Sequence, residues 1–129
     1  MNRTRYTALS KGRTGKRGKM NRTETKYSDE LTARKLAGEI VQFWFEPFSL
    51  RLTSNVEGSK TKPARYTPDF MVLYPDGLTE IVDVKGTGPD DIAGDVRMKA
   101  AAELFPLWRF IKAKQRKVRD GGGFVRIEV

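Results

Sequence analysis

The sequence predicts a single α/β domain in which a central mixed β-sheet is flanked by α-helices. Three observations lead to this class. A helical pattern occupies residues 22–37, short apolar segments typical of strands follow it, and a second helical pattern separates two strand-like segments further on. A helix that connects two strands favours a sheet containing both parallel and antiparallel pairs. The length of 129 residues is enough for one hydrophobic core.

The first helix is predicted over residues 22–37. Asn21 and Glu24 have the spacing of a capping box. Tyr27 and Leu31 share a face with Glu24, because residues three, four and seven apart lie together on a helix. We therefore expect Glu24 on or beside the buried stripe. The alternative is that Glu24 only caps the start of the helix.

The central part of the chain predicts strands. Residues 39–52 are rich in aromatic and β-branched side chains, which indicates one or two strands broken near Pro47. Residues 53–65 form a polar segment and are expected to be a loop. Residues 66–74 and 79–85 are expected to pair as a hairpin around a Pro-Asp-Gly turn.

The C-terminal half predicts a helix between two strands. The helix runs from about residue 91 to residue 105 and is capped by Asp90 or Asp91. Its apolar residues recur at helical spacing and are expected to face the core: Ile92, Val96, Ala100 and Leu104. A strand is expected over residues 108–118, and a glycine turn with a last short strand over residues 121–129.

Charge is distributed unevenly along the chain. The net charge is +9, yet residues 1–22 hold eight Lys or Arg residues and no Asp or Glu. Residues 1–20 are therefore expected to form a flexible basic arm, and residues 21–129 the folded domain. A second basic cluster spans residues 109–119. Such excess positive charge favours a polyanionic partner, although solubility alone would also explain a basic tail.

The composition excludes several kinds of chemistry. The chain has no Cys and no His, so thiolate zinc sites, Cys nucleophiles, Ser-His-Asp triads and histidine metal centres are excluded. No apolar segment approaches the length of a membrane span, and the polar N-terminus does not look like a secretory signal. We expect a cytoplasmic protein that does not bind membranes. Phosphate chemistry would have to use carboxylates, Lys and a hard cation.

The predicted hairpin carries three charges in otherwise apolar strands: Asp69, Asp83 and Lys85. A turn centred on residues 76 and 77 places Asp69 opposite residues 83 and 84. Two adjacent carboxylates repel each other, and a divalent cation such as Mg²⁺ relieves the repulsion. A nearby lysine offsets the charge of a phosphate, so the set suits phosphodiester hydrolysis. The alternative is an ion pair between an Asp and a Lys that supports only the fold.

These motifs resemble those of a known group of enzymes. The segments YTPDF (66–70) and DVKG (83–86), followed by a helix containing Lys99, resemble the PD-(D/E)xK nuclease superfamily. Asp83 stands where that pattern more often has Glu. The wider pattern, from Glu24 to the hairpin, is similar to small phage-encoded nucleases and to Holliday-junction resolvases of the phage endonuclease I type. One departure is Glu46, where the phage family tends to have Gln.

The resemblance implies a restriction-endonuclease-like fold and Mg²⁺-dependent cleavage of DNA, with Mn²⁺ able to substitute. It implies Lys85 as the catalytic lysine and Glu24 as a helix carboxylate, a role for which Glu30 and Glu39 compete. The implied metal-binding positions are Asp69, Asp83, Val84 and Glu24. The expected DNA-binding residues are Arg13, Lys16, Arg17, Lys19, Lys99, Lys114, Arg116 and Lys117.

Three functions remain open from the sequence. The first is a structure-selective DNA endonuclease, similar to a junction resolvase in phage DNA recombination or processing, acting in the host cytoplasm as a homodimer. The second is an exonuclease or the nuclease subunit of a larger recombination or transposition machine. The third is an accessory protein that binds DNA without cutting it.

Overall fold

The computed structural model describes residues 18–54 and 57–129 and confirms the α/β class. Two α-helices and one short 3₁₀-helix, η1, are present in these residues: α2 (Arg22–Leu36), α3 (Ile92–Leu104) and η1 (Val118–Asp120). Seven strands accompany them: β1 (Gln42–Phe45), β2 (Leu50–Arg51), β3 (Arg65–Tyr66), β4 (Phe70–Leu73), β5 (Thr79–Lys85), β6 (Arg109–Gln115) and β7 (Phe124–Glu128).

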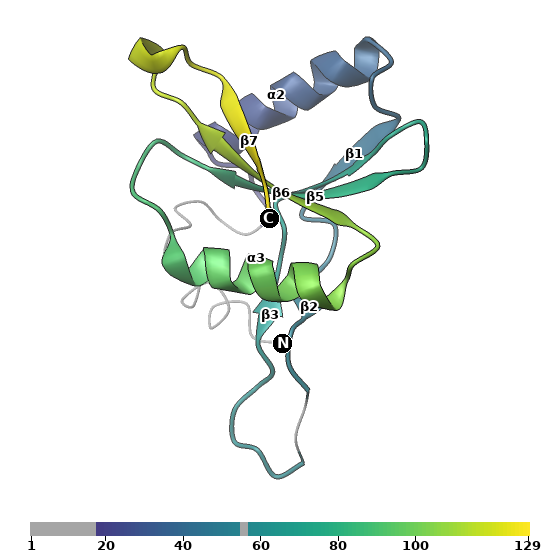
Figure 1. Cartoon of the computed structure of the whole chain (residues 1–129), viewed down its shortest axis with the longest axis vertical. Coiled ribbons are helices and arrows are strands. Elements are labelled where there is room, and N and C mark those ends of the chain that lie inside the picture. The colour runs from purple at the N-terminus through teal and green to yellow at the C-terminus, as the bar shows by residue number, and fades with distance from the viewer. Residues whose placement is uncertain (1–17, 55–56) are drawn as a thin grey trace.

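The central sheet is mixed, as expected. Its five strands have the order β1-β4-β5-β6-β7. The β5–β6 pair is parallel and is bridged by α3, while the other neighbours are antiparallel. Figure 1 shows α2 on one face of this sheet and α3 on the other. Strands β2 and β3 form a separate two-stranded sheet that lies beyond α3.

Alternation along β5 divides the apolar residues into two cores. Val82 faces α2 and packs with Tyr27 and Leu31. Ile81 faces the opposite way and packs with Met98 and Ala101 of α3. Successive side chains of a strand point to opposite faces, so Asp83 and Lys85 lie on the α3 face together with Ile81.

Helix α2 begins where the sequence predicts. The Asn21 side chain accepts a hydrogen bond from the Glu24 amide, and the Glu24 side chain accepts one from the Asn21 amide, which completes the capping box. Glu24, Tyr27 and Leu31 are the buried residues of this helix. The expected buried stripe is therefore confirmed, and Glu24 both caps the helix and lies at the end of that stripe.

The hairpin forms with a shorter first strand than expected. Strand β4 begins only at Phe70, whereas residues 65 and 66 belong to β3 and pair with β2. Pro68 separates the two pieces, because proline has no amide to donate to a ladder. The register pairs Phe70 with Val82. Asp69 is one residue further along, and its amide donates to the Val82 carbonyl at 3.1 Å, so its position is next to Asp83.

The predicted core face of α3 is wrong. Ile92, Val96 and Leu104 are 77%, 61% and 52% exposed, whereas the buried residues of this helix are Gly94, Met98 and Ala101. Gly94 and Ala101 take up little space, so this side of α3 can approach the sheet closely and pack well against it. The larger apolar stripe is left on the outer surface.

No helix in the described ranges is long and apolar enough to cross a membrane.

Candidate active site

The candidate site is a cleft at the carboxyl ends of the parallel strands β5 and β6. Its volume is about 440 Å³. The first turns of α2 and α3 form parts of its wall. The N-terminus of a helix carries partial positive charge, and ligands of α/β sheets commonly bind beyond the carboxyl ends of the strands. The cleft lies where ligands of α/β sheets commonly bind, and its wall carries both acidic and basic side chains.

Two carboxylates of the hairpin lie side by side in this cleft. Asp69 and Asp83 are only 6% and 7% exposed. Oδ2 of Asp69 accepts the Val84 amide at 2.7 Å, which ties the carboxylate to β5. The Asp69 carbonyl accepts the amide of Glu46 at 2.8 Å, so the end of β1 holds the same residue from the other side. Glu46 adopts a positive φ of 44°, a strained conformation for a residue with a side chain.

The pKa of Asp69 lies well above its ordinary value. Burial is the largest cause, followed by the nearby Asp83 carboxylate and then by Glu24, which also forms a side-chain hydrogen bond with Asp69. The hydrogen bond from Val84 opposes these effects only in part. Three acidic side chains are thus brought together, and the protein compensates the negative charge of Asp69 only in part.

Glu24 reaches this pair from the N-terminal turn of α2. Its side chain is 5% exposed and contributes to the cleft wall. The two competing acidic residues, Glu30 and Glu39, are exposed and do not line the cleft. The geometry therefore favours Glu24 among the three glutamates considered.

Lys85 lies next to the carboxylates on the same face of β5. Its Nζ is 2.8 Å from Asp83 Oδ2 and 3.3 Å from Asp91 Oδ2. Burial by itself would lower the pKa of Lys85, but Asp83 and then Asp91 outweigh it, and the pKa lies above its ordinary value. Lys85 is consequently an ammonium at neutral pH.

The donors in the cleft are hard oxygens, the kind that Mg²⁺ prefers. Within the part of the chain that the structure describes, however, no three His, Cys, Asp or Glu side chains are arranged as a ready-made metal-binding group. Asp69 accepts the Val84 amide and also bonds to Glu24, and Asp83 contacts Lys85. Val84 contributes its amide to Asp69. The carboxylate pair, with Glu24 beside it, offers oxygens of the kind that a divalent cation takes.

We expect replacement of Asp69 by Asn to stabilise the metal-free protein at alkaline pH. Because the pKa of Asp69 is raised on folding, the folded state binds its proton more tightly than the unfolded state does. The free energy of unfolding of the wild type therefore falls as pH rises from about 4 toward the raised pKa. Asn has no charge to bury and can still accept the Val84 amide.

Thermal melts in EDTA between pH 4 and pH 9 would test this expectation. The Asp69→Asn midpoint should exceed that of the wild type at pH 8, and the difference should shrink toward pH 4. Asp120→Asn, an exposed aspartate outside the cleft, serves as the control. A variant that melts below the wild type at pH 8 would show that the Asp69 charge supports the fold.

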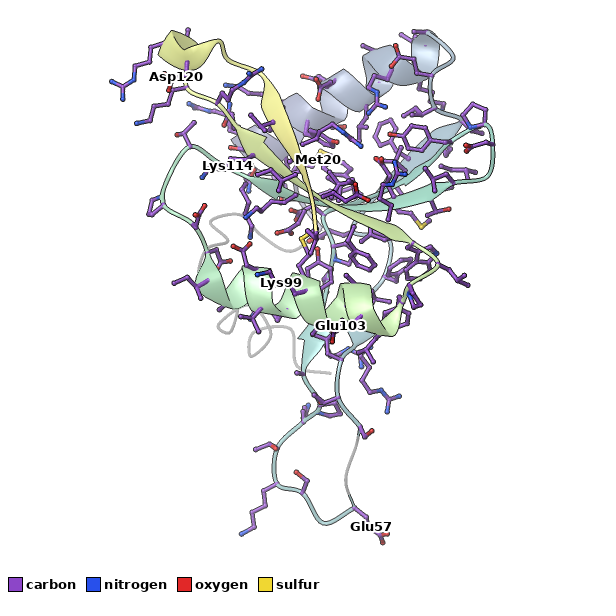
Figure 2. The ribbon with its side chains drawn as sticks, in the orientation of Figure 1. Met20, Glu57, Lys99, Glu103, Lys114 and Asp120 are labelled. Carbon is purple, nitrogen blue, oxygen red and sulfur yellow. The ribbon has the colours of Figure 1, made fainter. Side chains whose placement is uncertain are left out.

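The predicted DNA-binding residues are scattered. Lys114 lines the cleft, and its Nζ donates to the Gly88 carbonyl at 2.6 Å. Figure 2 shows Lys99 on α3 and Lys114 apart from that helix, at the sheet. Four of the residues are exposed but do not line the cleft: Lys19, Lys99, Arg116 and Lys117. Three others lie outside the described residues: Arg13, Lys16 and Arg17.

Several cleft residues were missed by the sequence reasoning. Lys112 pairs in register with Asp83, so it lies on the same face of the sheet, and its Nζ is 3.3 Å from Asp95 Oδ2. Arg22 and Arg97 also line the cleft. The sequence signal that could have found Lys112 is its spacing of two residues from Lys114, which places both lysines on one face of a strand. Using it required knowing that β6 lies parallel to β5 and in which register.

Comparison with known proteins gives one match. The sequence pattern of a family described as "Protein of unknown function (DUF1064)" matches residues 11–114. No curated protein and no solved structure matches the chain. The matched span includes Glu24, Asp69, Asp83 and Lys85 and ends within β6. Since it covers most of the 129 residues, the chain belongs to the DUF1064 family.

Proposed function

We propose that this protein is a Mg²⁺-dependent DNA endonuclease that hydrolyses phosphodiester bonds. The observation that carries the proposal is the buried Asp69–Asp83 pair beside Lys85 in the cleft. A protein seldom buries like charges together without a compensating ligand. A restriction-endonuclease-like fold, with a mixed sheet between two helices, is part of the same proposal.

The metal would be held by Asp69 and Asp83, with Glu24 and the Val84 position beside them. When bound, Mg²⁺ would supply an activated water and would neutralise charge on the phosphate, and Mn²⁺ would supply the same chemistry. The raised pKa of Asp69 supports this role, because a cation relieves the repulsion that raises it.

Lys85 would act on the phosphate as a cation. Its ammonium is charged, half-buried and directed to the same cleft as the carboxylates. A fixed positive charge in a partly desolvated site stabilises the extra negative charge that develops on a phosphate during hydrolysis. Lys85 would thus complement the carboxylates, whose role is to hold and orient the metal ion.

DNA would be bound mainly through its backbone. Basic side chains line the cleft and are suited to phosphates: Arg22, Lys85, Arg97, Lys112 and Lys114. Contacts to phosphates position a protein without reading the base sequence. This favours recognition of DNA shape, as in a Holliday-junction resolvase acting in phage DNA recombination. Paired cuts would require two sites, so a homodimer and a cytoplasmic location belong to the proposal.

A panel of labelled DNAs tests this function. Duplex, single-stranded, flap and four-way-junction DNA are incubated with the protein in Mg²⁺, in Mn²⁺ and in EDTA. We expect internal cuts, most readily in the branched DNAs, with either metal and none in EDTA. Cleavage that persists in EDTA, or no cleavage of any DNA, would overturn the proposal. Degradation from the ends would indicate an exonuclease, and binding without cleavage an accessory protein.

A further inference from the structure

A single carboxylate connects the start of α3 to Lys85. Asp91 is the N-cap of this helix, and its Oδ1 accepts the Gly94 amide at 3.0 Å. Its other oxygen, Oδ2, is 3.3 Å from Lys85 Nζ. The cap uses one oxygen and leaves the second for the lysine. Asp91 therefore does more than begin a helix.

Gly94 provides the space that this contact occupies. It is buried in the first turn of α3 and has no positive φ, so the backbone there does not require glycine. Glycine inside a helix costs about 0.5–1 kcal/mol relative to alanine. A Cβ at this position would lie 2.4 Å from Asp91 Oδ2 and 2.9 Å from Lys85 Nζ. The ion pair thus fills the volume that any other side chain would take.

We propose that Asp91 and Gly94 form a socket that positions the Lys85 ammonium for the reaction. The socket is defined as the Asp91 carboxylate together with the space above Gly94. This inference rests on the proposed nuclease function. Asp83 also contacts Lys85, but in that function Asp83 is shared with the metal. Asp91 is the carboxylate left to hold the lysine, and both socket residues act through Lys85 without touching substrate.

A purely structural role for these residues makes different demands. Helix capping needs only Oδ1 of Asp91 and is served equally well by Asn. Helix propensity by itself favours alanine over glycine at position 94. The socket instead requires the charge of Asp91 and the absence of a Cβ at position 94. Asp91→Asn separates the two roles, because it keeps the cap and removes the charge.

The test uses Gly94→Ala and Asp91→Asn in the full chain. Gly94→Ala should move the Asp91 carboxylate and the Lys85 ammonium, because its Cβ would lie 2.4 Å from Asp91 Oδ2 and 2.9 Å from Lys85 Nζ, so its melting temperature is measured beside its rate. Its kcat on a cleaved DNA should fall about 10- to 100-fold with little change in KM, as expected for a misplaced catalytic group. Asp91→Asn keeps the cap and should show the same fall in kcat.

Glu103→Gln is the matched control for Asp91→Asn. It also removes one carboxylate charge from α3, but Glu103 is exposed and does not line the cleft. Its kcat should remain within a few-fold of the wild-type value. A second readout does not depend on cleavage. In metal-free protein, the NMR signal of the Lys85 amine, assigned with Lys85→Ala, should shift in Gly94→Ala and Asp91→Asn but not in Glu103→Gln.

The outcomes separate the socket from the nuclease proposal. If the wild type cuts no DNA, the proposed function fails, whereas the NMR shifts still decide whether the socket holds Lys85. If the wild type cuts DNA and both socket variants keep its kcat and its Lys85 signal, the socket proposal is overturned. Should Gly94→Ala not fold, Asp91→Asn decides: a lower kcat supports the socket and an unchanged kcat rejects it.

Discussion

Asp83→Asn is expected to abolish DNA cleavage while leaving DNA binding intact. Asp83 lies beside Asp69 in the cleft and is one of its three buried carboxylates, the third being Glu24. Removing it would remove a metal ligand. A bound metal is worth several kcal/mol of transition-state stabilisation, so the rate should fall about 10³-fold or more. Binding should persist or strengthen, because one negative charge facing the phosphates is lost.

Lys85→Ala should lower the rate by a different route. It removes a positive charge next to the phosphate, which is worth about 10²- to 10³-fold in comparable sites, and leaves the carboxylates in place. Affinity for Mn²⁺, measured calorimetrically, should fall in Asp83→Asn but not in Lys85→Ala. Asp120→Asn raises the net charge by one, as Asp83→Asn does, but at an exposed position outside the cleft. It should cut DNA like the wild type.

If Asp83 and Lys85 form an ion pair that supports only the fold, their replacement should lower stability and leave the cleavage activity of the folded protein unchanged. Removing one partner would then leave an uncompensated charge and cost several kcal/mol of stability. Melting temperatures in EDTA and cleavage rates are therefore measured on the same preparations. If Asp83→Asn melts far below the wild type and yet cuts DNA when folded, the hairpin charges are structural and the nuclease proposal is wrong.

Arg126→Ala is expected to destabilise the fold strongly at neutral pH. Glu80 on β5 is 1% exposed and faces α2, and its Oε2 is 2.5 Å from Nη2 of Arg126 on β7. Its Oε1 accepts the Tyr74 hydroxyl at 2.9 Å, and Arg126 also donates to the Tyr27 hydroxyl at 3.3 Å. Loss of Arg126 leaves the Glu80 charge buried and unneutralised, a cost of about 3–5 kcal/mol.

A second substitution identifies the cause of this loss. Adding Glu80→Gln to Arg126→Ala should restore part of the stability at pH 8, because the unneutralised charge is gone.

The matched control is Arg109→Ala, on the neighbouring strand β6. Arg109 Nε is 3.6 Å from Glu128 Oε1, but the two side chains are 44% and 70% exposed. An exposed pair of this kind contributes less than about 1 kcal/mol. Urea unfolding of the three variants gives the comparison. Equal losses for Arg126→Ala and Arg109→Ala would contradict the assignment of a buried ion pair.

Sequence alone determined the features that depend on nearby residues. Asn21 and Glu24 are three apart, so their capping box predicted where α2 begins, and the structure agrees. The Asp76-Gly77 turn set the register of the hairpin to within one residue, which brought Asp69 beside Asp83. Both results follow because the interacting groups are close in the chain, and their geometry is set by local backbone preferences.

Only the tertiary structure decided how the separate elements meet. The residues of α3 that face the sheet were assigned incorrectly, because periodicity locates an apolar stripe but does not measure how close the helix must approach. Lys112 reaches the cleft because β6 lies parallel to β5, and Glu80 is buried because α2 and β7 cover it. Glu24 meets Asp69, and Asp91 meets Lys85, only once the two helices start at the same edge of the sheet. Apart from Asp91 and Lys85, which are six residues apart, these contacts join elements far apart in the chain, so packing of the whole domain sets them.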